Sequence, residues 1–202
     1  LTLFALNGVT TIRGMLGHPQ HIVLRNKIQS GELIGPRFIT SGPSFSGNSV
    51  KSPAEGETMV EAQKKAGYDF LKLHPGLTPA TFGAISKKAN ELNIPFSGHV
   101  SYTVGVWRAI DAGYTTIDHM DGFIESMVSG IENITESEAG SFGMFIGYRA
   151  DMNKAPALLK ALKEKNIWVV PTQALAERWF SPHKDADAFA LEPEMIYMKE
   201  ET

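Results

Sequence analysis

A lysine and two histidines lie in three successive apolar runs of this 202-residue sequence. Lys72 lies in DFLKLHPG, His99 in IPFSGHVS and His119 in TTIDHMDG. Imidazole is the commonest metal ligand among side chains, and a lysine on a buried strand is costly unless it is paired or used chemically. Either histidine alone would be an ordinary core or surface residue. The three at matching places predict one metal-centred site.

Helical patterns separate these three runs, at 79–92 between the first two and at 104–112 between the second and third. Strands that alternate with helices of this length are typical of parallel βαβ units. In a parallel barrel the active site forms at the C-terminal ends of the strands. Because all three residues fall at or near such an end, we expect them to lie close together.

The alternation of side chains along a strand assigns faces to the first run. Lys72 and His74 fall on one face, and Leu71 and Leu73 fall on the other. The leucines suit an outer face covered by helices, which leaves Lys72 in the interior. In the second run Gly98 lacks a side chain, so another group can approach the backbone closely there.

Further strands are expected at 8–13, 37–41 and 167–172, which makes six in all. Further helices are expected at 1–6, 21–29, 53–66, 154–165 and over most of 175–202, with a break at Ser181 and Pro182. Segment 123–151 fits neither periodicity and is expected to be an inserted excursion with a short helix and a glycine-bearing turn.

A closed (β/α)8 barrel needs eight strands and about 250 residues. The sequence therefore predicts an α/β fold, a partial barrel of about six parallel strands. A doubly wound nucleotide-binding sheet is disfavoured because residues 14–17 supply no G-x-G-x-x-G turn.

Composition excludes several classes of function. The chain has no cysteine, so it holds no disulfide, thiolate metal site or cysteine nucleophile. With a net charge of −3 it offers no basic surface for nucleic acid, and no apolar run approaches the roughly 20 residues of a membrane span. We expect a small-molecule substrate, and we leave a homo-oligomer open. The chain begins with Leu1 and ends in MKEET, as a piece of a longer protein would. The expectation is one catalytic barrel domain over 1–202, truncated at both ends, from a soluble protein that is cytoplasmic or exported.

The runs GVTTIR, IGPRFITSGPS, AGYDFLKLHPGL, IPFSGHVS and AGYTTIDHMDG resemble the amidohydrolase superfamily. Within it they are similar to the imidazolonepropionase-like and Xaa-Pro dipeptidase-like members, from Gly8 to about Leu175. The resemblance implies a (β/α)8 TIM-type barrel. It also implies metal-dependent hydrolysis of a C–N bond, in an amide, peptide or cyclic amide, by a metal-activated water.

The resemblance gives each of the three residues a role. Lys72 corresponds to the strand-four lysine, which is often carbamylated and bridges two divalent metals, zinc above all, so it is a metal ligand and a catalytic residue. His99 and His119 correspond to the metal-binding histidines of strands five and six. Bridged metals lower the pKa of a shared water toward neutrality. His74, Tyr102 and Arg13 are candidates for substrate contacts, Arg13 because a guanidinium binds a carboxylate with two hydrogen bonds.

Two parts of the family pattern have no counterpart here. The first-strand His-x-His pair is absent, and nothing after Thr172 resembles the eighth strand with its aspartate. The six expected strands thus correspond to strands two to seven, and we expect the isolated 202 residues to bind metal weakly and to lack meaningful hydrolysis.

Two other interpretations stay open. One is a barrel aldolase that uses Lys72 as a Schiff-base amine, which leaves both histidines idle. The other is an incomplete barrel without catalysis.

Overall fold

The computed structural model describes residues 1–174, 177 and 185–197. It forms two units, Leu1–Pro171 and Thr172–Thr202. The second unit contains helix α10 (Ala186–Ala190) and the 3-10 helix η5 (Pro193–Tyr197). The expected break at 181–182 lies outside the described residues.

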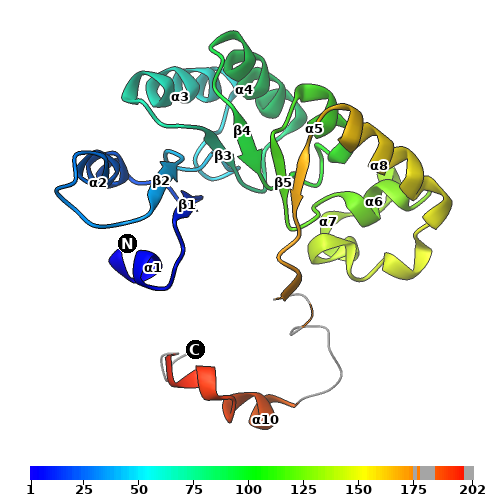
Figure 1. The fold of residues 1–202 in the computed structure, drawn as a ribbon. Coiled ribbons are helices and arrows are strands. Elements are labelled where there is room, and N and C mark those ends of the chain that lie inside the picture. The colour runs from blue at the N-terminus through cyan, green and yellow to red at the C-terminus, as the bar shows by residue number, and fades with distance from the viewer. Residues whose placement is uncertain (175–176, 178–184, 198–202) are drawn as a thin grey trace. The chain divides into compact units, whose positions relative to one another are not determined.

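The first unit contains six strands that are parallel and follow one another in sequence order (Figure 1). The strands are β1 (Thr11–Gly14), β2 (Arg37–Thr40), β3 (Leu71–Leu73), β4 (Phe96–Gly98), β5 (Thr116–Asp118) and β6 (Trp168–Val170). β1 and β2 pair with each other, and β3 to β6 form a four-stranded sheet. Parallel bridges from Ser41 to Phe70 and from Phe45 to Leu73 join the two sheets. The predicted order and direction of the strands are confirmed.

Helices connect the strands, as a βαβ arrangement requires. They are α2 (Pro19–Gln29), α3 (Pro53–Ala66), α4 (Pro79–Glu91), α5 (Val106–Ala112) and α8 (Ala155–Glu164), and a short helix α1 (Thr2–Leu6) precedes β1. α3 and α4 begin where the sequence predicts, because Ser52 and Thr78 cap their first turns and a proline follows each cap. α2 begins two residues earlier than expected, because the His18 side chain accepts a hydrogen bond from the backbone N–H of Gln20.

The main core lies between the four-stranded sheet and helices α3, α4, α5 and α8, which follow one another along one side of the strands in Figure 1. Leu71, Leu73 and Ile117 point into this core and are fully buried. The predicted faces of β3 are therefore confirmed, and Lys72 lies on the face that the helices do not cover.

That inner face is strongly curved. The Arg13 Nη1 atom on β1 donates a hydrogen bond of 3.0 Å to the Thr116 hydroxyl on β5. Four steps between adjacent strands separate β1 from β5, or roughly 19 Å along a flat sheet at about 4.8 Å per step. An arginine side chain cannot span that distance, so the strands must bend until their inner faces meet. This curvature is that of part of a barrel, and among the described residues β1 and β6 do not pair to close it.

Segment 123–151 is an excursion, as the sequence predicts, and it contains several short helices where the sequence predicts one. It contains α6 (Phe123–Met127), η1 (Ile131–Asn133), α7 (Glu136–Ala139), η2 (Ser141–Gly143) and η3 (Gly147–Arg149), followed by η4 (Met152–Lys154). Val128, Ala139 and Ile146 form a small apolar cluster that is separate from the main core. Within the described part of the chain no helix is long and apolar enough to cross a membrane.

Candidate metal and active site

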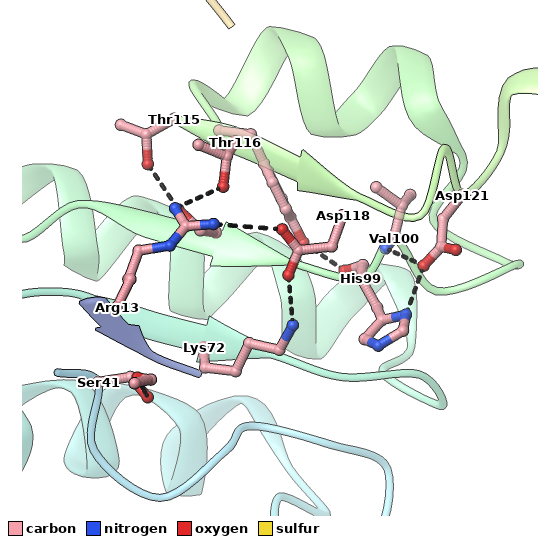
Figure 2. Close-up of polar contacts among 12 residues, drawn as sticks. Arg13, Ser41, Lys72, His99, Val100, Thr115, Thr116, Asp118 and Asp121 are labelled. Carbon is pink, nitrogen blue, oxygen red and sulfur yellow. Dashed lines mark hydrogen bonds and ion pairs between the residues drawn. The ribbon is translucent and has the colours of Figure 1, made fainter. Parts of the chain in front are cut away.

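Lys72 is buried on the inner face and forms an ion pair across the sheet. It lies level with Ser97 of β4, which in turn lies level with Thr116 of β5. The lysine side chain passes over β4, and its Nζ atom donates to the Asp118 Oδ2 atom at 2.6 Å (Figure 2). Both side chains are buried, since that of Lys72 is 3% exposed and that of Asp118 is 5% exposed. Sequence reasoning missed Asp118, although its place one residue beyond buried Ile117 puts it on the inner face.

Gly98 makes room for this crossing. A Cβ atom at Gly98 would lie 2.3 Å from the Leu73 carbonyl oxygen and 2.8 Å from the Lys72 Cδ atom. The backbone of Gly98 also has a φ of +126°, which side chains rarely allow. The close approach predicted at this glycine is confirmed, and the group that approaches is Lys72 with its strand.

Asp118 lies between two cations. Its Oδ1 atom is 3.5 Å from the Arg13 Nη2 atom and makes no hydrogen bond within the described part of the chain. The Arg13 guanidinium is thus directed at a carboxylate of the chain itself and at Thr116. A role for Arg13 in binding substrate stays a prediction.

Three imidazole rings gather at the C-terminal ends of β3, β4 and β5. The His99 ring lies 4.6 Å from the His119 ring and 5.0 Å from the His74 ring, between centroids. The His99 Nδ1 atom is 2.8 Å from the Asp121 Oδ2 atom, which also accepts from the Val100 backbone N–H (Figure 2). A carboxylate at Nδ1 fixes the ring and leaves Nε2 as the donor to a metal. Asp121, also missed from the sequence, therefore orients His99.

The backbone at this site is strained. His119 and Met120 have φ values of +59° and +61°, and Phe142 has +58°. Apart from glycine, asparagine, aspartate and histidine, residues rarely adopt this left-handed region, so the strain falls on Met120 and Phe142, and such strain collects at functional sites. The turn directs His119 toward His99, and the Phe142 ring lies 6.1 Å from the His119 ring. The strained backbone therefore lies where the His99 and His119 rings approach each other.

Burial keeps two of these imidazoles neutral at physiological pH. The pKa of His74 is lowered to about 4, by burial first and then by Lys72 and His99. The pKa of His119 is also lowered, by burial and then by His99. A neutral imidazole has a lone pair free for a metal ion, so the electrostatics favour ligand binding by His119.

The residues present fit part of a metal site. His99 and His119 bring two imidazole donors together, and Asp121 supports one of them. Within the described part of the chain, no three or more carboxylates, histidines or cysteines gather as a complete ligand set. As an ammonium group paired with Asp118, Lys72 has no lone pair with which to bind a metal ion. A carbamate on the Lys72 nitrogen would supply an oxygen ligand, and the carbamate stays a prediction.

A cavity of about 720 Å³ opens beside the imidazoles. Segment 123–151 and the ends of β3 and β4 form its walls, and its lining includes His99, Tyr102 and Asp121. The Tyr102 hydroxyl donates to the Ile134 carbonyl at 2.8 Å, which anchors the tyrosine to the excursion. Of the predicted candidates, His99 and Tyr102 line this cavity, whereas His74 and His119 are placed beside His99 by their ring contacts.

Solved structures of hydrolases share this arrangement of strands and helices. An ochratoxinase from A. niger has a TM-score of 0.60 at 17% identity, over 88% of this chain and 45% of its own. A bottromycin amidohydrolase has a TM-score of 0.57 at 21% identity, over 68% of this chain and 32% of its own. A Xaa-Pro dipeptidase with bound methionine in its active site has a TM-score of 0.52 at 22% identity, over 81% of this chain and 55% of its own.

The chain has the fold of these three hydrolase structures. The resemblance seen in the sequence is thereby confirmed at the level of the fold. No family model and no curated protein matches the chain. The chain spans about a third to just over half of the length of these amidohydrolase structures.

Proposed function

We propose that the protein is a metal-dependent hydrolase of a C–N bond in an amide, peptide or cyclic amide. The observation that carries this proposal is the convergence of His99 and His119, with Asp121 on the Nδ1 atom of His99. Two imidazoles, one of them oriented by a carboxylate, form a common part of hydrolytic zinc sites. The fold, shared with hydrolases of amide and peptide bonds, supports the same reaction class.

His99 and His119 would hold the ion, and Lys72 would add a ligand once it is carbamylated. A bound zinc ion would supply a water activated at neutral pH. The chain's own residues then orient the reactants. His74, neutral because its pKa is about 4, can exchange a hydrogen bond with the substrate. Phe142 lies beside the His119 ring and, with other residues of segment 123–151, lines the cavity in which the substrate would bind.

The assay for this function uses the natural protein with Xaa-Pro dipeptides, N-acyl amino acids and cyclic amides as substrates. We expect C–N cleavage that disappears when a chelator removes the metal and returns when zinc is added. Metal content by mass spectrometry, measured on the same samples, shows whether removal was complete. Cleavage that continues at full rate in a metal-free sample would contradict the proposal.

A further inference from the structure

Arg13 is held on the inner face of the strands by groups from two other parts of the chain. Its Nη1 atom donates a hydrogen bond of 3.0 Å to the Thr116 hydroxyl on β5. Its guanidinium carbon lies 5.6 Å from the centroid of the Phe70 ring, within the range of a cation–π contact. Phe70 is itself buried, directly before β3. The guanidinium is therefore fixed by an acceptor and by an aromatic ring.

The fixed guanidinium faces one oxygen of Asp118. The Arg13 Nη2 atom is 3.5 Å from the Asp118 Oδ1 atom, which is buried and makes no hydrogen bond within the described part of the chain. The Oδ2 atom of the same carboxylate accepts from Lys72 (Figure 2). A carboxylate turns easily about its last bond, since that torsion is broad. Because a cation lies beside each oxygen, Arg13 and Lys72 together set the plane of the Asp118 carboxylate.

Asp118 in turn sets the position of the Lys72 nitrogen. A lysine ammonium is a point charge on a flexible stem of four carbons, so its partner decides where it lies. The partner of the Lys72 Nζ atom is the Asp118 Oδ2 atom at 2.6 Å. A change in the orientation of this carboxylate would therefore move Nζ. Arg13, Asp118 and Lys72 thus form a row in which the first residue orients the second and the second places the third.

This row adjoins the imidazoles. Asp118 directly precedes His119, and Lys72 lies two residues before His74 on the same face of its strand. Arg13 is not among the residues that line the 720 Å³ cavity beside His99. The place of Arg13 therefore fits support of Lys72 better than direct contact with a substrate.

Arginine suits this place because its charge is permanent. A guanidinium stays protonated in proteins, whereas a lysine amine can lose its charge. Under the proposed function Lys72 carries a carbamate, and Asp118 then has no ammonium partner. Arg13 would remain beside Asp118 as the counter-charge of a buried carboxylate, which is costly to bury without one.

We propose that Arg13 is a positioning residue that acts through Asp118 on Lys72. The proposal rests on the proposed function in one respect, that Lys72 becomes a metal ligand. Arg13 keeps the Asp118 carboxylate in one orientation, and that carboxylate holds the Lys72 nitrogen at its place on the inner face. Arg13 does not contact the substrate.

The first test needs neither metal nor substrate. It compares crystal structures of the metal-free natural protein, Arg13→Gln and Arg25→Gln. Glutamine at position 13 is shorter and uncharged, so we expect the Asp118 carboxylate to turn and the Lys72 Nζ atom to move by about 1 Å, enough to disturb chemistry. Arg25→Gln is the matched control, because Arg25 pairs with Asp69 at 2.8 Å, outside the row, and should leave both groups in place. Unmoved Asp118 and Lys72 side chains in Arg13→Gln would overturn the proposal.

Zinc affinity and steady-state kinetics of the same variants distinguish the roles that Arg13 could have. Residues that orient the ligands of a metal typically contribute 10- to 100-fold to metal affinity or activity, so we expect Arg13→Gln to bind zinc about 10-fold more weakly. Its kcat should fall by about 10- to 100-fold with KM within about twofold. A substrate contact would instead raise KM and leave zinc affinity unchanged. A merely structural residue would lower only the melting temperature. Either of these two results would contradict the positioning role.

Two further variants decide the question if Arg13→Gln does not fold. Arg13→Lys keeps the positive charge but lacks the planar fork that serves both Thr116 and Asp118. It should bind zinc more weakly than the natural protein and more tightly than Arg13→Gln. Thr116→Val keeps the shape of the side chain and removes the acceptor of Arg13, so it should weaken zinc binding in the same direction. Natural zinc affinity in both of these variants would refute the proposal.

The positioning role and the proposed function can fail separately. A natural protein that binds no zinc and cleaves no C–N bond would refute the proposed function, and the metal-free crystal structures would still decide on Arg13. A natural protein that does both, with Asp118 and Lys72 unmoved in Arg13→Gln, would refute the positioning role alone.

Discussion

Asp118→Ala is expected to destabilise the protein by about 3–5 kcal/mol, which is the usual cost of removing one partner of a buried ion pair. The Lys72 side chain is 3% exposed, and its Nζ atom has the Asp118 Oδ2 atom as its partner at 2.6 Å. Alanine would leave the ammonium group buried without a counter-charge. It would also leave the half-buried Arg13 without its carboxylate. Urea denaturation of both proteins measures the difference.

Two companion variants make this measurement specific. Asp111→Ala removes an aspartate from an exposed position of α5 and should change stability by no more than about 0.5 kcal/mol. The double variant Lys72→Met with Asp118→Leu removes both charges and should recover much of the stability that Asp118→Ala loses. If Asp118→Ala were as stable as Asp111→Ala, the buried ion pair would not exist as described.

Lys72→Arg is expected to abolish metal-dependent turnover in the natural protein, with a loss of at least about 100-fold. Arginine keeps the positive charge and a partner for Asp118, but it stays protonated and cannot form a carbamate. The extra volume must fit where Gly98 leaves little space, so some loss of stability, about 1–3 kcal/mol, is also expected. Initial rates on a cleaved substrate, measured below the melting temperature of the variant, separate the two effects.

Lys160→Arg provides the control for that substitution. Lys160 lies on the exposed side of α8, and its Nζ atom is 3.8 Å from the Oε1 atom of Glu164. Either lysine or arginine fits at this exposed position. We expect this variant to keep full activity. Turnover at the natural rate in Lys72→Arg would refute the metal-bridging role of Lys72 and leave it as a structural partner of Asp118.

The order of the elements follows from the sequence because local signals mark it. The cap at Ser52 and the left-handed Gly67 bound α3 at the residues that the sequence predicts. The alternation of Leu71, Lys72 and Leu73 likewise predicts the two faces of β3. These features depend on neighbours in sequence, so no knowledge of tertiary contacts is needed.

The partners of the predicted site residues are harder to predict. Lys72 and Asp118 are 46 residues apart and meet only because β3, β4 and β5 align in register. The cavity beside His99 could not be predicted, because segment 123–151 has neither helical nor strand periodicity and the cavity forms only where this segment packs beside His99. Composition excludes nucleic acid and thiolate chemistry, but it carries no information about such long-range pairings.

The most direct test of the account is the zinc content of the natural protein and of its variants His99→Asn and His119→Asn, measured by mass spectrometry after dialysis. We expect each histidine variant to lose bound zinc. We also expect Asp121→Asn, which disturbs the orientation of His99, to bind zinc about 10- to 100-fold more weakly. His18→Asn, on the loop before α2, should keep the zinc content of the natural protein. Undiminished zinc in both His99→Asn and His119→Asn would show that the metal is held elsewhere or not at all.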